Sequence, residues 1–234
     1  TFNLRDIQGN WTFEKNCFRK NNLTPNSANK QAELYALINI YTTEACSMSS
    51  IAFNDNFIDQ VAIFPYGYEE SNSIAENYVF AIETPRPVTF NNLTLKNIYV
   101  NTIKASVMYI SDSTKLIMNN SWFEAIKVRS DYGVINLLAK SIFISNSYFT
   151  EISNVYEIGL FYIDPPSGNY SAQLVNNTFD SINAAAMGAI LVAKSLVNVN
   201  ARNSEKPEIK AKFYLSLQIQ NCTSRNSGFG HLIT

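Results

Sequence analysis

A pattern of apolar residues that returns six times constrains this chain more than any other feature. With h for an apolar residue, the pattern reads h-x-h-x-N-x-x-h-x-x-h, where N stands for Asn or Asp. Five complete copies and one copy that degrades in its second half begin at Ile51, Val88, Leu116, Ile142, Ala172 and Leu217. Recurrence of one unit at a period of this length indicates a solenoid.

The Asn/Asp position of the pattern gives the period. It is occupied by Asp55, Asn92, Asn120, Asn146, Asn176 and Asn221, at intervals of 37, 28, 26, 30 and 45 residues. The three central intervals predict about 26–30 residues per coil of a solenoid. The two long intervals contain polar stretches near 66–77 and 200–210, which we interpret as loops inserted into a coil.

A second motif advances with the first. The segment that starts at Gly133 (GVINLLAKS) resembles the one at Gly188 (GAILVAKS), and a related apolar run starts at Gly159. Stacked coils produce two motifs with a common period, whereas a sandwich of antiparallel strands does not. Leucine-rich repeats also place Asn after alternating apolar residues, but their Leu-rich frame is different.

The pattern predicts short strands with one buried face, because apolar and polar residues alternate in h-x-h. Asn ends the strand, since it tolerates the left-handed turn conformation, and we expect h-x-x-h to carry the chain around a corner. The predicted fold is an all-β, right-handed parallel β-helix with inserted loops. It forms one domain over 1–234, less regular over 1–50, and we expect it to be a segment of a longer chain.

Over roughly residues 50–234 the repeat pattern resembles that of the pectin-lyase-like superfamily of right-handed parallel β-helices. Many members cleave acidic polysaccharides, with carboxylates as acid and base. The strings Asn-Thr-Asp, Asp-Asp, Gly-His-Gly and Arg-Ile-Lys of polygalacturonase-like enzymes are absent, and only Asn54-Asp55-Asn56 and Gly230-His231-Leu232 echo them. The resemblance therefore implies a non-catalytic, extracellular or adhesin-like member.

The acidic residues support the same expectation. Four of them lie nearest the repeat corners: Asp112, Asp131, Asp164 and Asp180. No two share a repeat position in adjacent coils, where they would form the close carboxylate pair of glycosidic chemistry. We interpret them as solvated turn residues, and Arg129 and Arg225 as surface charges. No enzyme activity, cofactor or metal is expected.

The amino-acid composition limits the classes of partner that we expect. A net charge of −1 with 16% charged residues gives no basic excess, so nucleic acid is not an expected partner. No run of 18 apolar residues occurs, so no membrane span is expected in this segment. Trp122, Tyr148 and Thr178 fall in one predicted column, which is either a sugar-stacking strip or a packing column under loops.

Asn is frequent, at 30 residues, and seven Asn begin N-x-S/T sequons, which is typical of a secreted protein. We expect the repeated Asn/Asp side chains to face inward and form an Asn ladder, where Asn92, Asn176 and Asn221 could not carry a glycan. Glycans are therefore expected first on Asn10, Asn22, Asn119 and Asn169.

Three cysteines are too few for a disulfide scaffold. Cys17 and Cys46 are 29 residues apart, close to one predicted coil. Residues stacked one coil apart lie about 4.8 Å from each other, which a disulfide can bridge. The spacing therefore allows a Cys17–Cys46 disulfide and leaves open whether the two thiols pair.

The sequence favours a structural glycoprotein at the cell surface or outside the cell, with the β-helix as a rigid shaft, filament or adhesin component. The expected partners are N-linked glycans, further copies stacked along the solenoid axis, and polysaccharide. One alternative is a carbohydrate-binding module with a groove between loops 66–77 and 200–210. Another is a divergent polysaccharide lyase or hydrolase.

Overall fold

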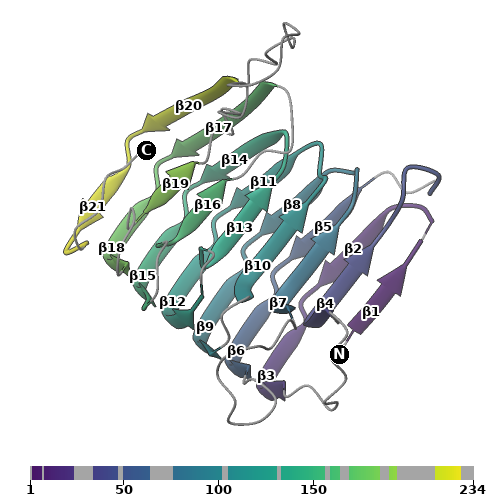
Figure 1. Cartoon of the computed structure of the whole chain (residues 1–234), viewed down its shortest axis with the longest axis horizontal. Coiled ribbons are helices and arrows are strands. Elements are labelled where there is room, and N and C mark those ends of the chain that lie inside the picture. Colours follow the sequence, from purple (N-terminus) through teal and green to yellow (C-terminus); the bar gives the residue numbers. More distant parts are fainter. Residues whose placement is uncertain are drawn as a thin grey trace, which may run out of the picture.

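The computed structural model describes residues 2–6, 8–23, 34–46, 50–63, 76–101, 105–130, 133–155, 159–163, 169–184, 190–193 and 214–227. Every regular element in these ranges is a β-strand, and the strands form three seven-stranded sheets that are parallel throughout. The sheets wind into a right-handed parallel β-helix (Figure 1), which confirms the predicted fold.

Each sheet takes every third strand of the chain. Sheet A contains β1 (Phe2–Arg5), β4 (Leu34–Tyr41), β7 (Glu76–Glu83), β10 (Ala105–Ser111), β13 (Ile135–Leu138), β16 (Phe161–Ile163) and β19 (Leu191–Ala193). Sheet B contains β2 (Trp11–Glu14), β5 (Ile51–Asn54), β8 (Val88–Asn91), β11 (Leu116–Asn119), β14 (Ser141–Ser145), β17 (Asn169–Val175) and β20 (Tyr214–Gln220). Sheet C contains β3 (Cys17–Leu23), β6 (Phe57–Ile63), β9 (Thr94–Asn101), β12 (Trp122–Arg129), β15 (Tyr148–Asn154), β18 (Thr178–Ala184) and β21 (Thr223–Arg225).

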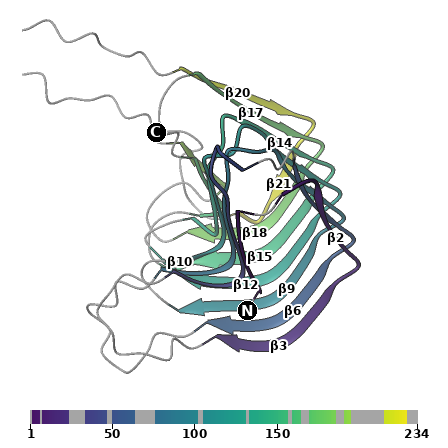
Figure 2. The same ribbon diagram turned by 90° about the vertical axis from the view of Figure 1, so that its right-hand side faces the viewer.

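Three consecutive strands make one coil, and the described strands form seven coils, numbered 1 to 7 from β1–β3 to β19–β21 (Figure 2). From coil 2 onward, residues stacked in neighbouring coils are 37, 28, 26, 30 and 45 positions apart along the chain. These values confirm the predicted period. Between coils 1 and 2 the interval is 40 residues, so the coil at the N-terminal end is longer than the central ones.

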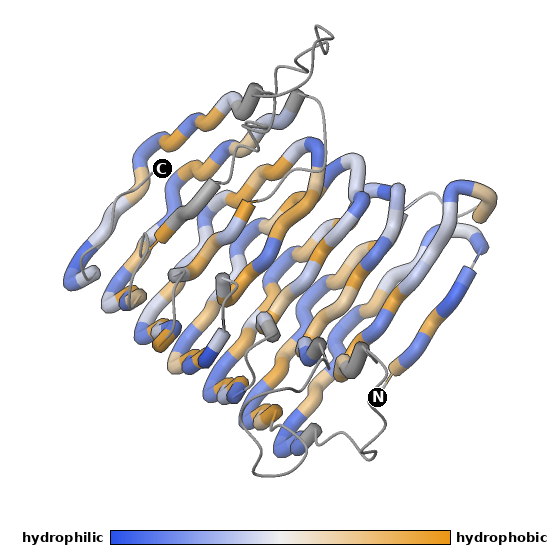
Figure 3. Tube along the Cα trace, viewed as in Figure 1, coloured by the Kyte–Doolittle hydropathy of each residue, from blue (hydrophilic) through white to orange (hydrophobic). Residues whose placement is uncertain are grey.

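The apolar positions of the pattern form the core. In coil 5, for example, Ile142, Ile144, Phe149 and Ile152 are all at most 2% exposed. Figure 3 shows the corresponding alternation of apolar and polar residues along the strands. Because each coil repeats the same inward positions, like side chains stack along the axis, and the ring of Phe149 lies 4.9 Å from that of Phe123.

The h-x-x-h segment bends the sheet C strand instead of ending it. In β6 the residue before Val61 is Gln60, whose φ is 56°, and it has no partner in the pairing of β6 with β9. The same position is left-handed in the later coils, at Asn97, Ala125, Glu151 and Ser181. Because neighbouring strands have this residue at the same position, neither has an extra residue; the left-handed backbone itself bends the strand and returns the next apolar side chain to the core. The expected corner into a new strand is therefore a bend within one strand.

The region over 1–50, expected to be less regular, provides all of β1 to β4. The insertion predicted near 66–77 ends earlier, because β7 begins at Glu76 and the Asn77 side chain is fully buried. The stretch 200–210 lies outside the described residues. No helix in the described part of the chain is long and apolar enough to span a membrane.

Candidate functional site

The six predicted ladder residues form a column at the corner between sheets B and C, and they face outward. All have φ between 50° and 54° and exposed side chains. Asn92 Nδ2 donates to Asp55 Oδ1 at 2.8 Å, and Asn176 Nδ2 donates to Asn146 Oδ1 at 3.2 Å. The prediction of inward amides is wrong, because this corner needs a left-handed residue, which Asn tolerates, and turns that residue toward solvent. We call this set the corner column.

A buried polar ladder lies one residue further along the chain. Its members are Asn16, Asn56, Ser121, Ser147, Asn177 and Cys222, with the buried Leu93 at the same position in coil 3. The backbone N–H of Asn16 donates to Asn56 Oδ1 at 3.1 Å, and that of Ser121 donates to Ser147 Oγ at 3.1 Å. These side chains satisfy turn backbone that would otherwise be buried without a partner. We call them the inner ladder.

Asn119, one of the sites expected to be glycosylated, belongs to a third stack. It precedes the corner column and lies between Asn91 and Ser145 in the sheet B register. Its Nδ2 donates to Asn91 Oδ1 at 3.3 Å, and its Oδ1 accepts from Ser145 Oγ at 2.7 Å. The Asn119 amide is thus engaged on both sides and half-buried, which leaves less room for a glycan there than at the exposed sequon residues.

The sequon residues divide by exposure. Five of them have exposed side chains: Asn10, Asn22, Asn92, Asn176 and Asn221. Asn169 belongs to β17, but its side chain lies outside what the structure describes. The geometric reason for ranking the corner-column sequons last is therefore removed, and Asn119 is the sequon whose surroundings oppose modification.

The outer face of sheet C carries a second, partly exposed column next to the corner. Its members, in coil order, are Cys17, Phe57, Thr94, Trp122, Tyr148, Thr178 and Thr223. The rings of Trp122 and Tyr148 lie 4.8 Å apart, and Trp122 is 44% exposed. We call this set the outer column. It contains the predicted stack of Trp122, Tyr148 and Thr178, and the exposure of Trp122 favours a contact surface over packing beneath loops.

Charged residues hold the indole of Trp122 in place. Its Nε1 donates to Glu124 Oε2 at 3.0 Å, and Lys96 Nζ lies 2.7 Å from the same oxygen and 5.0 Å from the centre of the indole ring. The hydrogen bond from Lys96 is the largest influence on Glu124 and lowers the pKa of its carboxyl below the usual value. A ring fixed in this way loses little freedom when a ligand packs on it.

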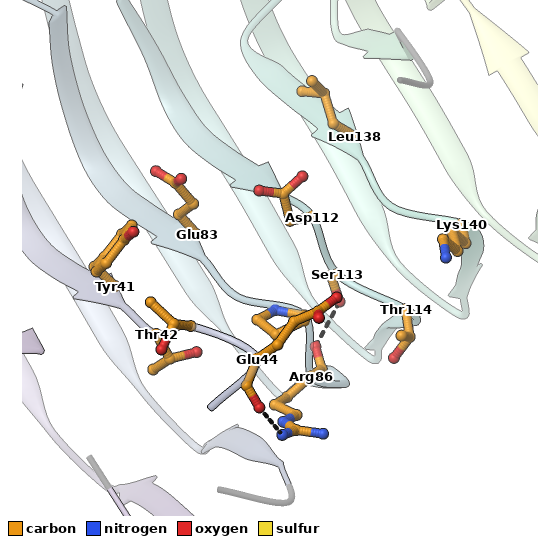
Figure 4. A pocket seen from close by; sticks show the side chains of 12 residues that line it. Tyr41, Thr42, Glu44, Glu83, Arg86, Asp112, Ser113, Thr114, Leu138 and Lys140 are labelled. Carbon is orange, nitrogen blue, oxygen red and sulfur yellow. Dashed lines mark hydrogen bonds between the residues drawn. The ribbon is translucent and has the colours of Figure 1, made fainter. Parts of the chain in front are cut away.

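An open groove follows the corner between sheets A and B. It has a cavity volume of about 720 Å³ and crosses coils 2 to 5, at the turns after β4, β7, β10 and β13. Figure 4 shows its side chains, among them Tyr41, Glu44, Glu83, Asp112 and Lys140. A smaller hollow of about 150 Å³ on sheet A shares Tyr41 and Glu83 with it. We call this cavity the corner groove.

Arg86 organises the floor of the corner groove. Its Nη2 donates to the carbonyl oxygens of Glu44 at 3.1 Å and Cys46 at 2.8 Å, which fixes the turn after β4. Its Nε is buried and has no hydrogen-bond partner among the described residues. Next to it, the hydroxyls of Thr42 and Thr84 lie 2.7 Å apart. An aromatic ring, hydroxyls and charges of both signs in one groove suit the hydroxyl groups of a sugar.

Of the four acids singled out in the sequence, the two that the structure describes do not meet. Asp112 lines the corner groove, whereas Asp180 lies on sheet C and accepts from Asn226 Nδ2 at 3.1 Å. Asp131, Asp164 and His231 lie outside the described residues. The carboxylates that share the groove with Asp112 are Glu44 and Glu83, from the two preceding coils; they were not predicted, because the turns that carry them have no repeated motif.

Potential metal ligands do not gather in groups of three or more within the described ranges. Arg129 is part of β12, and Arg225 is exposed on β21.

The disulfide that the spacing allows does not form. Cys17 is an exposed free thiol on β3, paired in register with Phe57, and Cys46 is a buried free thiol in the turn after β4. The two residues occupy different repeat positions, because the first coil interval is 40 residues and not 29.

Comparison with known proteins finds no matching family model, no matching curated protein and no matching solved structure.

Proposed function

We propose that this chain is the shaft of an extracellular or cell-surface glycoprotein, in which a rigid β-helix carries N-linked glycans on its outer corners. The observation that carries the proposal is the exposure of five sequon Asn side chains on the outside of a regular parallel β-helix. Each N-x-S/T acceptor at such a position can carry a bulky glycan without disturbing the core. The chain serves as a spacer or adhesin component and has no catalytic activity.

The proposed family is the pectin-lyase-like superfamily, as a non-catalytic member. Its support is the three-sheet coil together with a left-handed Asn at one corner, seen at Asn92, Asn120, Asn146, Asn176 and Asn221. Stacking of further copies along the axis belongs to the same proposal. Sedimentation that changes with protein concentration is the expected sign of such stacking.

Native cells that express the chain provide the test of the proposed location. Intact cells are labelled with a membrane-impermeant amine reagent, and the chain is then treated with a peptide N-glycosidase. We expect the chain to be labelled and to lose several kilodaltons of apparent mass on glycan removal. A chain that is labelled only after the cells are opened, and whose mass is unchanged, contradicts the proposal.

The corner groove supports a second candidate function, the binding of an oligosaccharide. The groove combines Tyr41 with Glu83, Asp112 and Lys140 over several coils, so an extended ligand would run along the solenoid axis. A glycan array with the intact protein identifies the sugar, and Tyr41→Ala with Glu83→Gln should remove the signal. Thr150→Ala, on the outer face of sheet C, serves as the control that keeps it.

Incubation with pectins and alginates in the presence of calcium tests the non-catalytic part of the proposal. We expect no unsaturated or reducing product. A product that forms with the native protein, and not with the Glu83→Gln variant, would assign a polysaccharide lyase or hydrolase to the corner groove.

A further inference from the structure

The outer column and the corner-column sequons follow one rule across coils 2 to 7. Coils with a sequon at the corner have Thr two residues later, at Thr94, Thr178 and Thr223. Coils without a sequon at the corner have an aromatic residue there, at Phe57, Trp122 and Tyr148. The sequon itself demands the Thr, but nothing in the sequon demands aromatic residues on the coils beside it.

The aromatic residues lie directly next to the sequon coils. Trp122 of coil 4 donates its backbone N–H to the carbonyl of Leu93 in coil 3 at 2.8 Å, and Leu93 follows Asn92. On the other side of that coil, Thr94 donates to the carbonyl of Asn56, which precedes Phe57. With strands about 4.8 Å apart and about 3.3 Å per residue, Asn92 lies within about 8 Å of both aromatic positions.

Asn176 of coil 6 has the same relation to one aromatic residue. Thr178, two residues after it, donates its backbone N–H to the carbonyl of Ser147, the residue before Tyr148. Asn221 of coil 7 differs, because the described coil beside it presents Thr178 and no ring at this position. Among the three corner-column sequons of the described coils, two therefore have aromatic neighbours and one, at the matched position, does not.

We propose that the aromatic residues of the outer column are docking surfaces for the chain's own N-glycans, with the first sugar on Asn92 packed against Trp122 and that on Asn176 packed against Tyr148. The apolar face of a pyranose ring, lined by C–H groups, complements the electron-rich face of an aromatic ring. Thr94 and Thr178 have smaller side chains than the neighbouring aromatic residues, so they leave space beside these rings. The inference rests on the proposed glycoprotein function and names what the glycans contact.

The hydrogen bonds of the corner column are compatible with this modification. Transfer of the glycan from a lipid-linked diphosphate donor joins the first sugar carbon to Asn92 Nδ2, while the diphosphate leaves and one amide hydrogen departs as a proton. The remaining N–H can keep the bond to Asp55 Oδ1, now 2.8 Å long. The glycan is thereby anchored at its root, which lowers the entropic cost of packing its first sugar on a neighbouring ring.

Trp122 reports directly on the proposed contact. The chain has two tryptophans, so Trp11→Phe leaves Trp122 as the single indole. The protein is secreted from eukaryotic cells, occupancy of each sequon is read by glycopeptide mass spectrometry, and indole fluorescence is quenched with acrylamide. Asn92→Gln should raise the quenching constant roughly twofold, because a docked sugar covers about half of the exposed ring. Asn221→Gln should leave the constant unchanged.

A second measurement does not depend on the Trp11→Phe variant. Protons of a sugar packed on an indole are shifted upfield by the ring current, and Trp122→Leu should abolish this shift at the Asn92 glycan while the glycan on Asn221 keeps its spectrum. Equal quenching constants for the parent and Asn92→Gln proteins, with Asn92 occupied, overturn the docking and leave the glycoprotein proposal intact. Absence of glycan from Asn92 alone also overturns the docking, and absence from all five exposed sequons overturns both.

Discussion

The backbone N–H of Ser147 donates to Asn177 Oδ1 at 2.9 Å, across the interface between two neighbouring coils and inside the solenoid. Asn177 Nδ2 in turn donates to the carbonyl of Ile144 at 2.8 Å. One buried amide thus satisfies two backbone groups of the preceding coil. The inner ladder ties neighbouring B–C corners together except at coil 3, where Leu93 interrupts it, and the corner column lies outside it.

Asn177→Ala should destabilise the protein by about 2–3 kcal/mol, because it leaves the buried N–H of Ser147 without its acceptor and removes a donor from the carbonyl of Ile144. The sequon of Asn176 keeps its Thr in this variant, so glycosylation is not altered directly. Urea unfolding followed by circular dichroism measures the change. Asn183→Ala, at an exposed position of the same β18 strand, should stay within about 0.5 kcal/mol. Equal effects of the two variants would refute the role of the inner ladder.

Ala125→Gly should stabilise the protein by about 1 kcal/mol, although glycine usually weakens strands. Ala125 has a φ of 54°, where its Cβ is strained and glycine is not. Ala52, on β5, is outside the positive-φ positions, and Ala52→Gly should cost about 0.5–1 kcal/mol. Thermal unfolding of both variants checks the left-handed bend, and a loss of stability in Ala125→Gly would contradict it.

Phe149→Ala should cost about 3–5 kcal/mol, as expected for a large buried aromatic residue. Its ring stacks on Phe123 at 4.9 Å and Phe179 at 5.4 Å and meets Phe161 edge-on at 5.3 Å. The adjacent outward Thr150 offers the control, since Thr150→Ala should change stability by less than about 0.5 kcal/mol. If the two variants had the same denaturant midpoint, the stacked core would be contradicted.

The pKa of Glu124 should lie below its ordinary value of 4.5, because Lys96 and Trp122 both donate to its carboxylate. A carboxyl whose folded-state pKa is lowered adds stability above its unfolded-state pKa, and this is lost as the pH falls through the folded-state value. Lys96→Met should therefore raise the pKa of Glu124 and reduce stability at neutral pH but not in acid. Carboxyl NMR titration measures the shift, and an unchanged pKa in Lys96→Met would rule out the Lys96 contribution.

The strands and the core could be predicted because an apolar residue at every second position has one physical meaning in a parallel coil. Val88 and Phe90 point inward as expected. If the alternation continued, Asn92 would also point inward. Its left-handed backbone, however, shifts the alternation by one residue. Leu93 is therefore buried and Asn92 exposed. A single backbone conformation thus explains both the wrong assignment of the ladder and the revised order of the glycan sites.

The corner groove could not be predicted, because three of the four A–B turns that line it, at 42–44, 85–86 and 112–114, have no motif in common. Glu83 and Asp112 are not stacked in register, since Glu83 pairs with Ser111. The groove exists only because four coils place different turns side by side. The Cys17–Cys46 disulfide does not form for a related reason. The average period of the central coils was applied to the first coil, which is longer.

Site-resolved glycosylation tests the central claim most directly. The chain is secreted from eukaryotic cells, its glycans are removed by peptide N-glycosidase in ¹⁸O water, and each former acceptor is identified by mass as labelled Asp. We expect label at the exposed Asn10, Asn22, Asn92, Asn176 and Asn221 and none at the half-buried Asn119. Label on Asn119, with the five exposed sequons unmodified, would contradict the claim.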